Sequence, residues 1–284
     1  MKKYYSLLLI LLLAVLISAC KETINEVEKP TDYDKADGIN GGIRYDKFWS
    51  TEADYSKKGD TDILAKLNAK ADFFRCKQCH GWDLVGTKGS YINRAPNANR
   101  PNISGMDLVT LAKTKTGQEL FDAIKKTAGR RDISFDLTTY DPSTNATEGD
   151  KMPNYTQLLT DAEIWDIVKF LKVEALDLTL LYDLTLTGTY PTGRATFSNI
   201  GKDGDAPVGK TYYGSKCASC HGADGTQLQM ESMTLGKFLR TKANESQHKI
   251  KFGQLGSAMT AFKTGLQDMK NLYKAVSDTV AFPN

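Results

Sequence analysis

The chain has 284 residues, of which 40% are hydrophobic and 25% are charged, a composition that fits a globular protein and excludes a disordered or fibrous one. At roughly 100–200 residues per domain, the length suggests two small domains or one large one. Lys and Arg total 37 against 34 Asp and Glu, and this formal net charge of +3 is too balanced for a dedicated nucleic-acid binder. We therefore expect no nucleic-acid partner.

The N-terminus predicts an export signal. A basic start is followed by an unbroken apolar run over residues 7–17, which is shorter than the roughly 17–25 residues of a membrane-spanning helix. Residues 16–20 (Leu-Ile-Ser-Ala-Cys) resemble the lipobox of bacterial lipoproteins, in which the Cys becomes the acylated first residue. We expect residues 1–19 to be removed and Cys20 to carry lipid; secretory cleavage that leaves Cys20 unmodified is the alternative.

Residues 20–40 predict a flexible tether between the lipid and the folded body, because the segment is polar, acidic and poor in apolar side chains. The residue after Cys20 is Lys21 and not the Asp of an inner-membrane retention signal, so the outer membrane is favoured as the anchoring membrane. Apolar anchors begin at Ile43, and we expect a first domain over residues 41–176.

Helical patterns dominate the first domain. They predict a helix over residues 108–128 with Gly129 as its stop, and another that starts at Thr160. Thr160 and Glu163 form a capping box. The apolar residues that follow at helical spacing make one buried stripe, formed by Ile164, Ile167, Val168 and Leu171.

A connector over residues 177–198 separates this domain from a second one over residues 199–284. Alternating Leu and Thr residues followed by turn residues predict that the connector is a short extended stretch or a small β-hairpin. Helices are predicted over residues 210–216 and, as an amphipathic stripe, over residues 266–276. Both halves show the same order: a short helix, a Cys pair with His, a loop, a helix, a Met and a closing helix. We therefore predict a mainly α protein of two tandem domains.

Four of the five Cys and two of the three His fall into two identical C-x-x-C-H patterns, the attachment signature of c-type haem. Two thiols three positions apart on a turn can add to the two vinyl groups of one haem, and the next residue, His, then faces the iron. The residues are Cys76, Cys79 and His80 in the first pattern and Cys217, Cys220 and His221 in the second. We expect two covalently bound haem c groups.

Two other uses of Cys pairs are disfavoured. A zinc site does not need the His that directly follows both pairs. Redox-active C-x-x-C disulfides are typically embedded in βαβ patterns, which this sequence lacks. The export signal agrees with haem, because c-type haem is attached outside the cytoplasmic membrane.

The sequence resembles a known family at these positions. Residues 76–82, and the Met152-Pro pair before a closing helix, are similar to a class I cytochrome c domain. Residues 212–225 and the stretch Met259-Thr-Ala-Phe resemble a second such domain, although Met-Thr stands there in place of the usual Met-Pro. The resemblance covers most of residues 41–284 and implies a two-domain dihaem c-type cytochrome.

Each motif His supplies one axial ligand, and the sixth position of each iron needs another side chain. For the first haem we expect Met152, because Pro153 stiffens its polar loop just ahead of the helix at Thr160. Met106, at the start of a helix, is the competitor. A Met that only covers apolar surface is the structural alternative for Met152.

For the second haem we expect Met259, which precedes its closing helix in the same relative place. His248 is the rival as the only spare imidazole, and otherwise we expect it to bond a haem propionate or the backbone. The remaining Met residues of this half are disfavoured: Met230 and Met233 follow His221 too closely, and Met269 belongs to a buried helical stripe.

Three further residues have weaker signals. Trp82 directly follows the first motif and its glycine, and it could pack on the haem edge. Arg94 and Arg100 could pair with haem propionates, because guanidinium groups suit carboxylates. Ordinary core or surface roles are the alternatives for all three.

Closed six-coordinate haems exchange electrons and do not bind substrate. We therefore expect an extracytoplasmic, lipid-anchored carrier without enzymatic activity, which passes single electrons between redox partner proteins. A peroxide-reducing dihaem cytochrome c peroxidase is disfavoured, because no His lies between His80 and His221. A thiosulfate-oxidising dihaem enzyme with a Cys ligand is disfavoured because the motifs use the available Cys. A haem subunit of a larger membrane oxidoreductase complex would have the same chemistry as the carrier.

Overall fold

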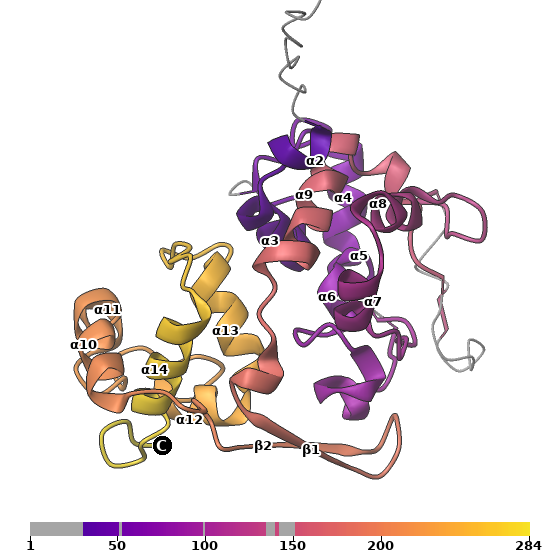
Figure 1. The fold of residues 1–284 in the computed structure, drawn as a ribbon. Coiled ribbons are helices and arrows are strands. Elements are labelled where there is room, and N and C mark those ends of the chain that lie inside the picture. Colours follow the sequence, from indigo (N-terminus) through magenta and orange to yellow (C-terminus); the bar gives the residue numbers. More distant parts are fainter. Residues whose placement is uncertain (1–30, 51–52, 99, 135–139, 142–150) are drawn as a thin grey trace, which may run out of the picture.

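The fold is given by a computed structural model, which describes residues 31–50, 53–98, 100–134, 140–141 and 151–284. Figure 1 shows two helical lobes and a long β-hairpin that runs beneath the first of them. The expected mainly α fold class is confirmed, since the described residues contain a single two-stranded sheet.

The expected signal peptide, Cys20 and the start of the tether lie outside the described residues. Within these residues, no helix combines the length and the hydropathy needed to cross a membrane.

The elements follow the order expected for two helical domains. The helices of the first lobe are α2 (Asp32–Lys35), α3 (Gly38–Lys47), α4 (Thr61–Ala69), α5 (Ala71–Phe74), α6 (Cys76–His80), α7 (Leu108–Thr114), α8 (Gly117–Lys125) and α9 (Asp161–Lys169). A π-helical turn over Phe170–Glu174 continues α9. The strands are β1 (Asp183–Thr187) and β2 (Arg194–Ser198). The helices of the second lobe are α10 (Ala206–Lys216), α11 (Ala218–His221), α12 (Leu235–Thr241), α13 (Ala243–Phe252) and α14 (Leu266–Val276).

The predicted tether is wrong for residues 31–40, which belong to the folded first lobe. Thr31 begins α2 with a capping box, and the Asp37 carboxylate caps α3 by accepting from two of its first N–H groups. The ring of Tyr33 packs edge-on against Trp165 of α9, with centroids 6.1 Å apart. Helix caps and one aromatic anchor thus outweigh the acidic composition that suggested a solvated segment.

The predicted helix over residues 108–128 is two helices, because the chain contains a second helix start inside it. The Thr116 hydroxyl accepts from the N–H of Glu119, while the Glu119 carboxylate accepts from the N–H of Thr116. This capping box ends α7 and starts α8 at Gly117. The same device was expected at Thr160 and is confirmed there, with the stripe behind it buried.

Each lobe is built around a crossing of its first and last long helices at a glycine. A Cβ on Gly41 of α3 would lie 1.9 Å from the carbonyl oxygen of Asp166 in α9. A Cβ on Gly209 of α10 would lie at the same 1.9 Å from the carbonyl oxygen of Asn271 in α14. Only a residue without a side chain allows two helix backbones to approach so closely.

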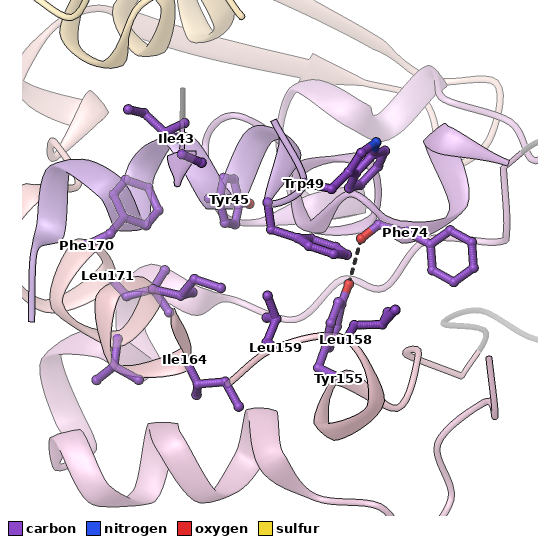
Figure 2. Close-up of a cluster of buried hydrophobic side chains, with 14 of the residues drawn as sticks. Ile43, Tyr45, Trp49, Phe74, Tyr155, Leu158, Leu159, Ile164, Phe170 and Leu171 are labelled. Atoms are coloured by element: carbon purple, nitrogen blue, oxygen red, sulfur yellow. Dashed lines mark hydrogen bonds between the residues drawn. The ribbon is translucent and has the colours of Figure 1, made fainter. Parts of the chain in front are cut away.

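Two main hydrophobic cores follow from these crossings. Figure 2 shows the first, in which Tyr45 of α3 lies among side chains of α9 and its π-helical turn, such as Ile164 and Phe170. The second core forms around α14 and includes Met269, which is fully buried there as predicted. Phe252 of α13 lies in the first core, although its helix belongs to the second lobe.

Helix α13 fastens the two lobes together. Phe252 packs on Phe170 with ring centroids 5.3 Å apart. The amide of Gln247 donates to the carbonyl of Trp82 at 3.3 Å, and the amide of Asn244 donates to the hydroxyl of Ser90 at 2.7 Å. The lobes therefore share a buried, hydrogen-bonded interface.

The connector takes the second of its two expected forms, a β-hairpin, and this hairpin also packs against the first lobe. Its antiparallel register pairs Leu184 with Phe197. Near its turn, Tyr190 packs against the small cluster around Trp82 and donates to the side chain of Asn102 at 3.3 Å. The hairpin thus folds back onto the first lobe.

The helix crossing yields a stability prediction. Gly41→Ala places a Cβ against the backbone of α9, which no side-chain rotation can relieve, so the clash should outweigh the gain of about 1 kcal/mol in helix propensity. We expect a net loss of roughly 1–3 kcal/mol in the free energy of unfolding, measured by urea denaturation.

Gly59→Ala is the matched control, because a Cβ there meets nothing within 4 Å. It should change the free energy of unfolding by less than about 0.5 kcal/mol. Equal effects of the two substitutions would show that the crossing does not depend on Gly41.

Candidate cofactor sites

The first C-x-x-C-H motif forms the short helix α6, and His80 is its last residue. Gly81 follows with φ 77°, a left-handed conformation that suits glycine, and its N–H closes the turn onto the carbonyl of Lys77 at 3.0 Å. The hydroxyl of Tyr45 donates to the carbonyl of Gly81 at 2.6 Å. Helix α3 therefore holds the turn that presents His80.

The second motif has the same construction. Helix α11 ends at His221, and Gly222 follows with φ 81°. The hydroxyl of Tyr213 donates to the carbonyl of Gly222 at 2.6 Å. Tyr213 lies four residues after Gly209, as Tyr45 does after Gly41, so both lobes use one turn of helix to link the crossing to the motif.

His80 faces a largely apolar cavity beside α6. Met152 lines the same cavity, and so do Cys76 and Cys79, which form no disulfide. Met106 lines it too, with 46% of its surface exposed. The apolar walls include Leu108, Leu111, Leu120, Ile124, Leu159, Ile167 and Leu171.

The backbone around Met152 is fixed at two points. The N–H of Arg131 donates to the carbonyl of Met152 at 2.8 Å, and the N–H of Asn154 donates to the carbonyl of Arg131 at 2.7 Å. Tyr155 bonds the carbonyl of Phe74 at 2.9 Å, as Figure 2 shows. The loop that carries Met152 is thus tied to the segment that leads into the motif.

The protonation state of His80 suits it to bind a metal. Burial, with a smaller effect from Arg130, lowers the pKa of His80 to about 4, so its imidazole is neutral at pH 7. A neutral imidazole has the lone pair that iron needs. The buried Nδ1 atoms of His80 and His221 have no hydrogen-bond partner among the described residues. The donor set of the first cavity therefore fits a covalently held haem.

The second cavity contains His221, Met259 and Met230 in its walls. The carbonyl of Met259 accepts from the N–H of Gln254 at 2.9 Å, which ties its loop to the end of α13. On the turn before His221, Cys217 packs against the second core and Cys220 is exposed, with no disulfide between them. This donor set also fits haem, in a more open site whose walls include a second candidate sulfur at Met230.

His248 lies away from both of these cavities. It is buried between the lobes, with Nε2 3.0 Å from the carbonyl oxygen of Gly42 and its ring 4.7 Å from that of Trp82. A backbone bond was one of the two roles expected for His248. Burial lowers its pKa to about 3.

The other sequence candidates lie elsewhere. Trp82 is buried at the lobe interface, beneath the ammonium groups of Lys77 and Lys249. Arg94 and Arg100 line a polar cleft next to the second cavity and not the first cavity. The arginines in the wall of the first cavity are Arg75 and Arg130, which sequence reasoning missed because neither stands in a recognisable pattern.

The described residues offer no classical site for a metal ion. No group of three or more His, Cys, Asp or Glu side chains gathers in them.

Comparison with known families gives two matches. Residues 67–173 match the family described as cytochrome c, and residues 204–277 match the family described as cytochrome c oxidase, cbb3-type, subunit III. The two matched regions are c-type cytochrome domains. The first match includes α6 and Met152, and the second includes α11 and Met259. Searches of curated proteins and of solved structures matched nothing.

The two cytochrome c domains imply that this protein functions in haem-based electron transfer. Cytochrome c domains are typically extracytoplasmic, which agrees with the export signal expected from the sequence. In c-type cytochrome domains, the thiols of a C-x-x-C-H motif attach the haem and its imidazole binds the iron.

The burial of His248 predicts a dependence of stability on pH. The unfolded chain takes up a proton on His248 as the pH falls below about 6.5, whereas the folded protein resists until about pH 3, so stability is present above pH 6.5 and is lost as the pH falls. His248→Gln keeps an N–H for the Gly42 carbonyl but does not titrate. Between about pH 7.5 and pH 4.5, wild type should lose roughly 2–3 kcal/mol more than this variant in urea denaturation. Equal losses would contradict the burial of a neutral His248.

Proposed function

We propose that the protein is an extracytoplasmic electron carrier with two haem c groups, which passes single electrons between redox partner proteins. The observation that carries this proposal is that a motif His and a loop Met line each cavity: His80 and Met152 the first, and His221 and Met259 the second. Bound at these positions, haem supplies a one-electron ferric–ferrous couple. The protein fixes the iron ligands on two rigid turns and two tied loops.

The axial ligands we propose leave no open position at either iron. Thioether sulfur from Met152 and Met259 favours the ferrous state and raises the reduction potential. The apolar walls of the first cavity act in the same direction, because they disfavour the additional positive charge of oxidised iron. Both features suit electron exchange and disfavour binding of a substrate to the iron.

A dihaem peroxidase needs an openable haem with a distal His. The chain has three His, of which two follow the Cys pairs, and His248 is held at the lobe interface. This supports a carrier over a peroxidase.

A subunit of a larger membrane complex is the second candidate. The observation that favours it is the similarity of residues 204–277 to subunit III of cbb3-type cytochrome c oxidase. In such a complex, the chemistry of both haems would be the same as in a free carrier.

The ligand assignment is tested by single substitutions. Met152→Ala and Met259→Ala should each open one iron, so that each ferrous variant binds carbon monoxide at one of its two haems in optical titrations, whereas wild type binds none. Met106→Ala and Met230→Ala are matched controls in the same cavities and should leave both irons closed.

Other outcomes have definite meanings. If Met230→Ala opens the second iron and Met259→Ala does not, the ligand is Met230. Wild-type protein that binds carbon monoxide or reacts with peroxide would overturn the proposal of an electron carrier.

The same samples report the number of haems, because thioether-linked haem stays on the denatured chain. We expect two haems per chain in wild type, and one in Cys79→Ser or Cys220→Ser.

We further propose that lipid on Cys20 anchors the protein to a membrane, with the outer membrane favoured by Lys21. Wild-type protein should partition into the detergent phase, and Cys20→Ser should move it to the aqueous phase with both haem spectra unchanged. Recovery of unmodified wild-type protein in the soluble fraction would contradict the anchor.

A further inference from the structure

One wall of the second cavity is contributed by the first domain. Arg75 and Lys77, which flank Cys76, line this cavity together with Lys249 of α13. Arg75 also lines the first cavity and so lies between the two sites. The second site is therefore built from side chains of both domains.

Two of these three cations already have a partner. Asp46 is 1% exposed, and its carboxylate is bonded by Arg75 and lies 3.1 Å from the ammonium of Lys249. Burial alone would raise the pKa of Asp46, but Lys249 and Arg75 more than offset this and hold it well below its ordinary value. Arg75 and Lys249 thus form an ionic cluster around the buried carboxylate of Asp46.

The acidic groups near this wall are also accounted for. Glu231 and Glu245 line the second cavity, and both pair with Lys242, the latter at 3.9 Å. Neither carboxylate lies within ion-pair distance of Lys77 in the described residues.

Lys77 is the cation that remains. It is only 7% exposed, its ammonium lies 4.4 Å from the ring centre of Trp82, and no hydrogen bond or ion pair holds it among the described residues. Burial, and next the charge of Arg75, lower the pKa of Lys77 to about 7; the carboxylates of Asp46 and Glu245 act in the opposite direction but do not offset the burial. A buried ammonium is costly unless an anion accompanies it, and Lys77 borders the second cavity.

We infer that Lys77 of the first domain binds a carboxylate of the haem held in the second cavity. The inference rests on the proposed function, since it requires haem at His221. Haem has two carboxylates at one edge, and an ammonium at the cavity wall supplies a point charge and hydrogen-bond donors for one of them. Lys77 is then a positioning residue of the first domain that acts on the second haem.

The test is a redox titration of the complete two-haem protein carrying Lys77→Gln. A positive charge near the iron disfavours the oxidised state, so its removal should lower the potential of one haem. We expect the ratio of reduced to oxidised haem at a fixed potential to fall on the order of tenfold, a shift of about 59 mV. The titration of the two-haem protein should show two redox transitions. Met259→His changes the proposed axial ligand of the second haem and therefore identifies which transition belongs to it. Lys77→Gln should shift only that transition.

Two variants control for other effects. Lys77→Arg keeps the charge and should restore the potential. Lys216→Gln removes a charge one residue before Cys217, but this side chain is exposed and lies outside the cavity wall. Because solvent screens its charge, the reduction potentials of both haems should stay nearly unchanged. Unchanged unfolding midpoints would show that Lys77→Gln alters the site and not the fold.

The outcomes separate this inference from the proposed function. Two haems with neither transition moved by Lys77→Gln would overturn the inference and leave the carrier intact. Equal shifts in Lys77→Gln and Lys216→Gln would also overturn it, because they would indicate a general charge effect. A wild-type chain without haem on the second motif would overturn the proposed function itself.

Discussion

Contact between two helix backbones at a glycine is the constraint on which each domain depends. Because Gly41 lets α3 lie against α9, Tyr45 one turn later reaches the carbonyl of Gly81 and holds the residue after His80. Gly209 and Tyr213 repeat this arrangement in the second domain. The residue after the motif His is thus held by a helix that contains none of the motif residues. The two domains share this geometry together with the C-x-x-C-H-G motif.

The parts of the fold that the sequence predicted are those with local causes. A C-x-x-C-H-G stretch contains both the helix and the glycine that ends it, and the box at Thr160 lies within four residues. The break before α8 also has a local cause, the capping box at Thr116, but continuous apolar spacing concealed it. The helical start of the first domain was hidden because acidic residues serve equally well as solvated side chains and as helix caps.

The candidate site was predictable to the extent that its residues are named by a motif. Distance along the chain is a poor guide to the Met residues. The short separation between His221 and Met230 disfavours Met230 as a ligand, yet a bridge between Met230 and Met233 turns the chain so that Met230 lines the cavity. Lys77 stands inside the first motif, where attention falls on the Cys and His residues. Its position at the second cavity depends on how the lobes pack, and no local pattern encodes that packing.

The position of Phe252 has a consequence for what counts as a unit in this protein. By sequence, α13 is part of the second domain, but the ring of Phe252 fills space in the core of the first, directly over Gly42. A chain divided at the hairpin would leave an apolar socket open on one fragment and an unburied aromatic ring on the other, and such surfaces promote aggregation. The two domains together are therefore the smallest unit that buries its own hydrophobic surface. Their two irons would be held at a fixed separation, so that electron transfer between them would not require the lobes to meet by diffusion.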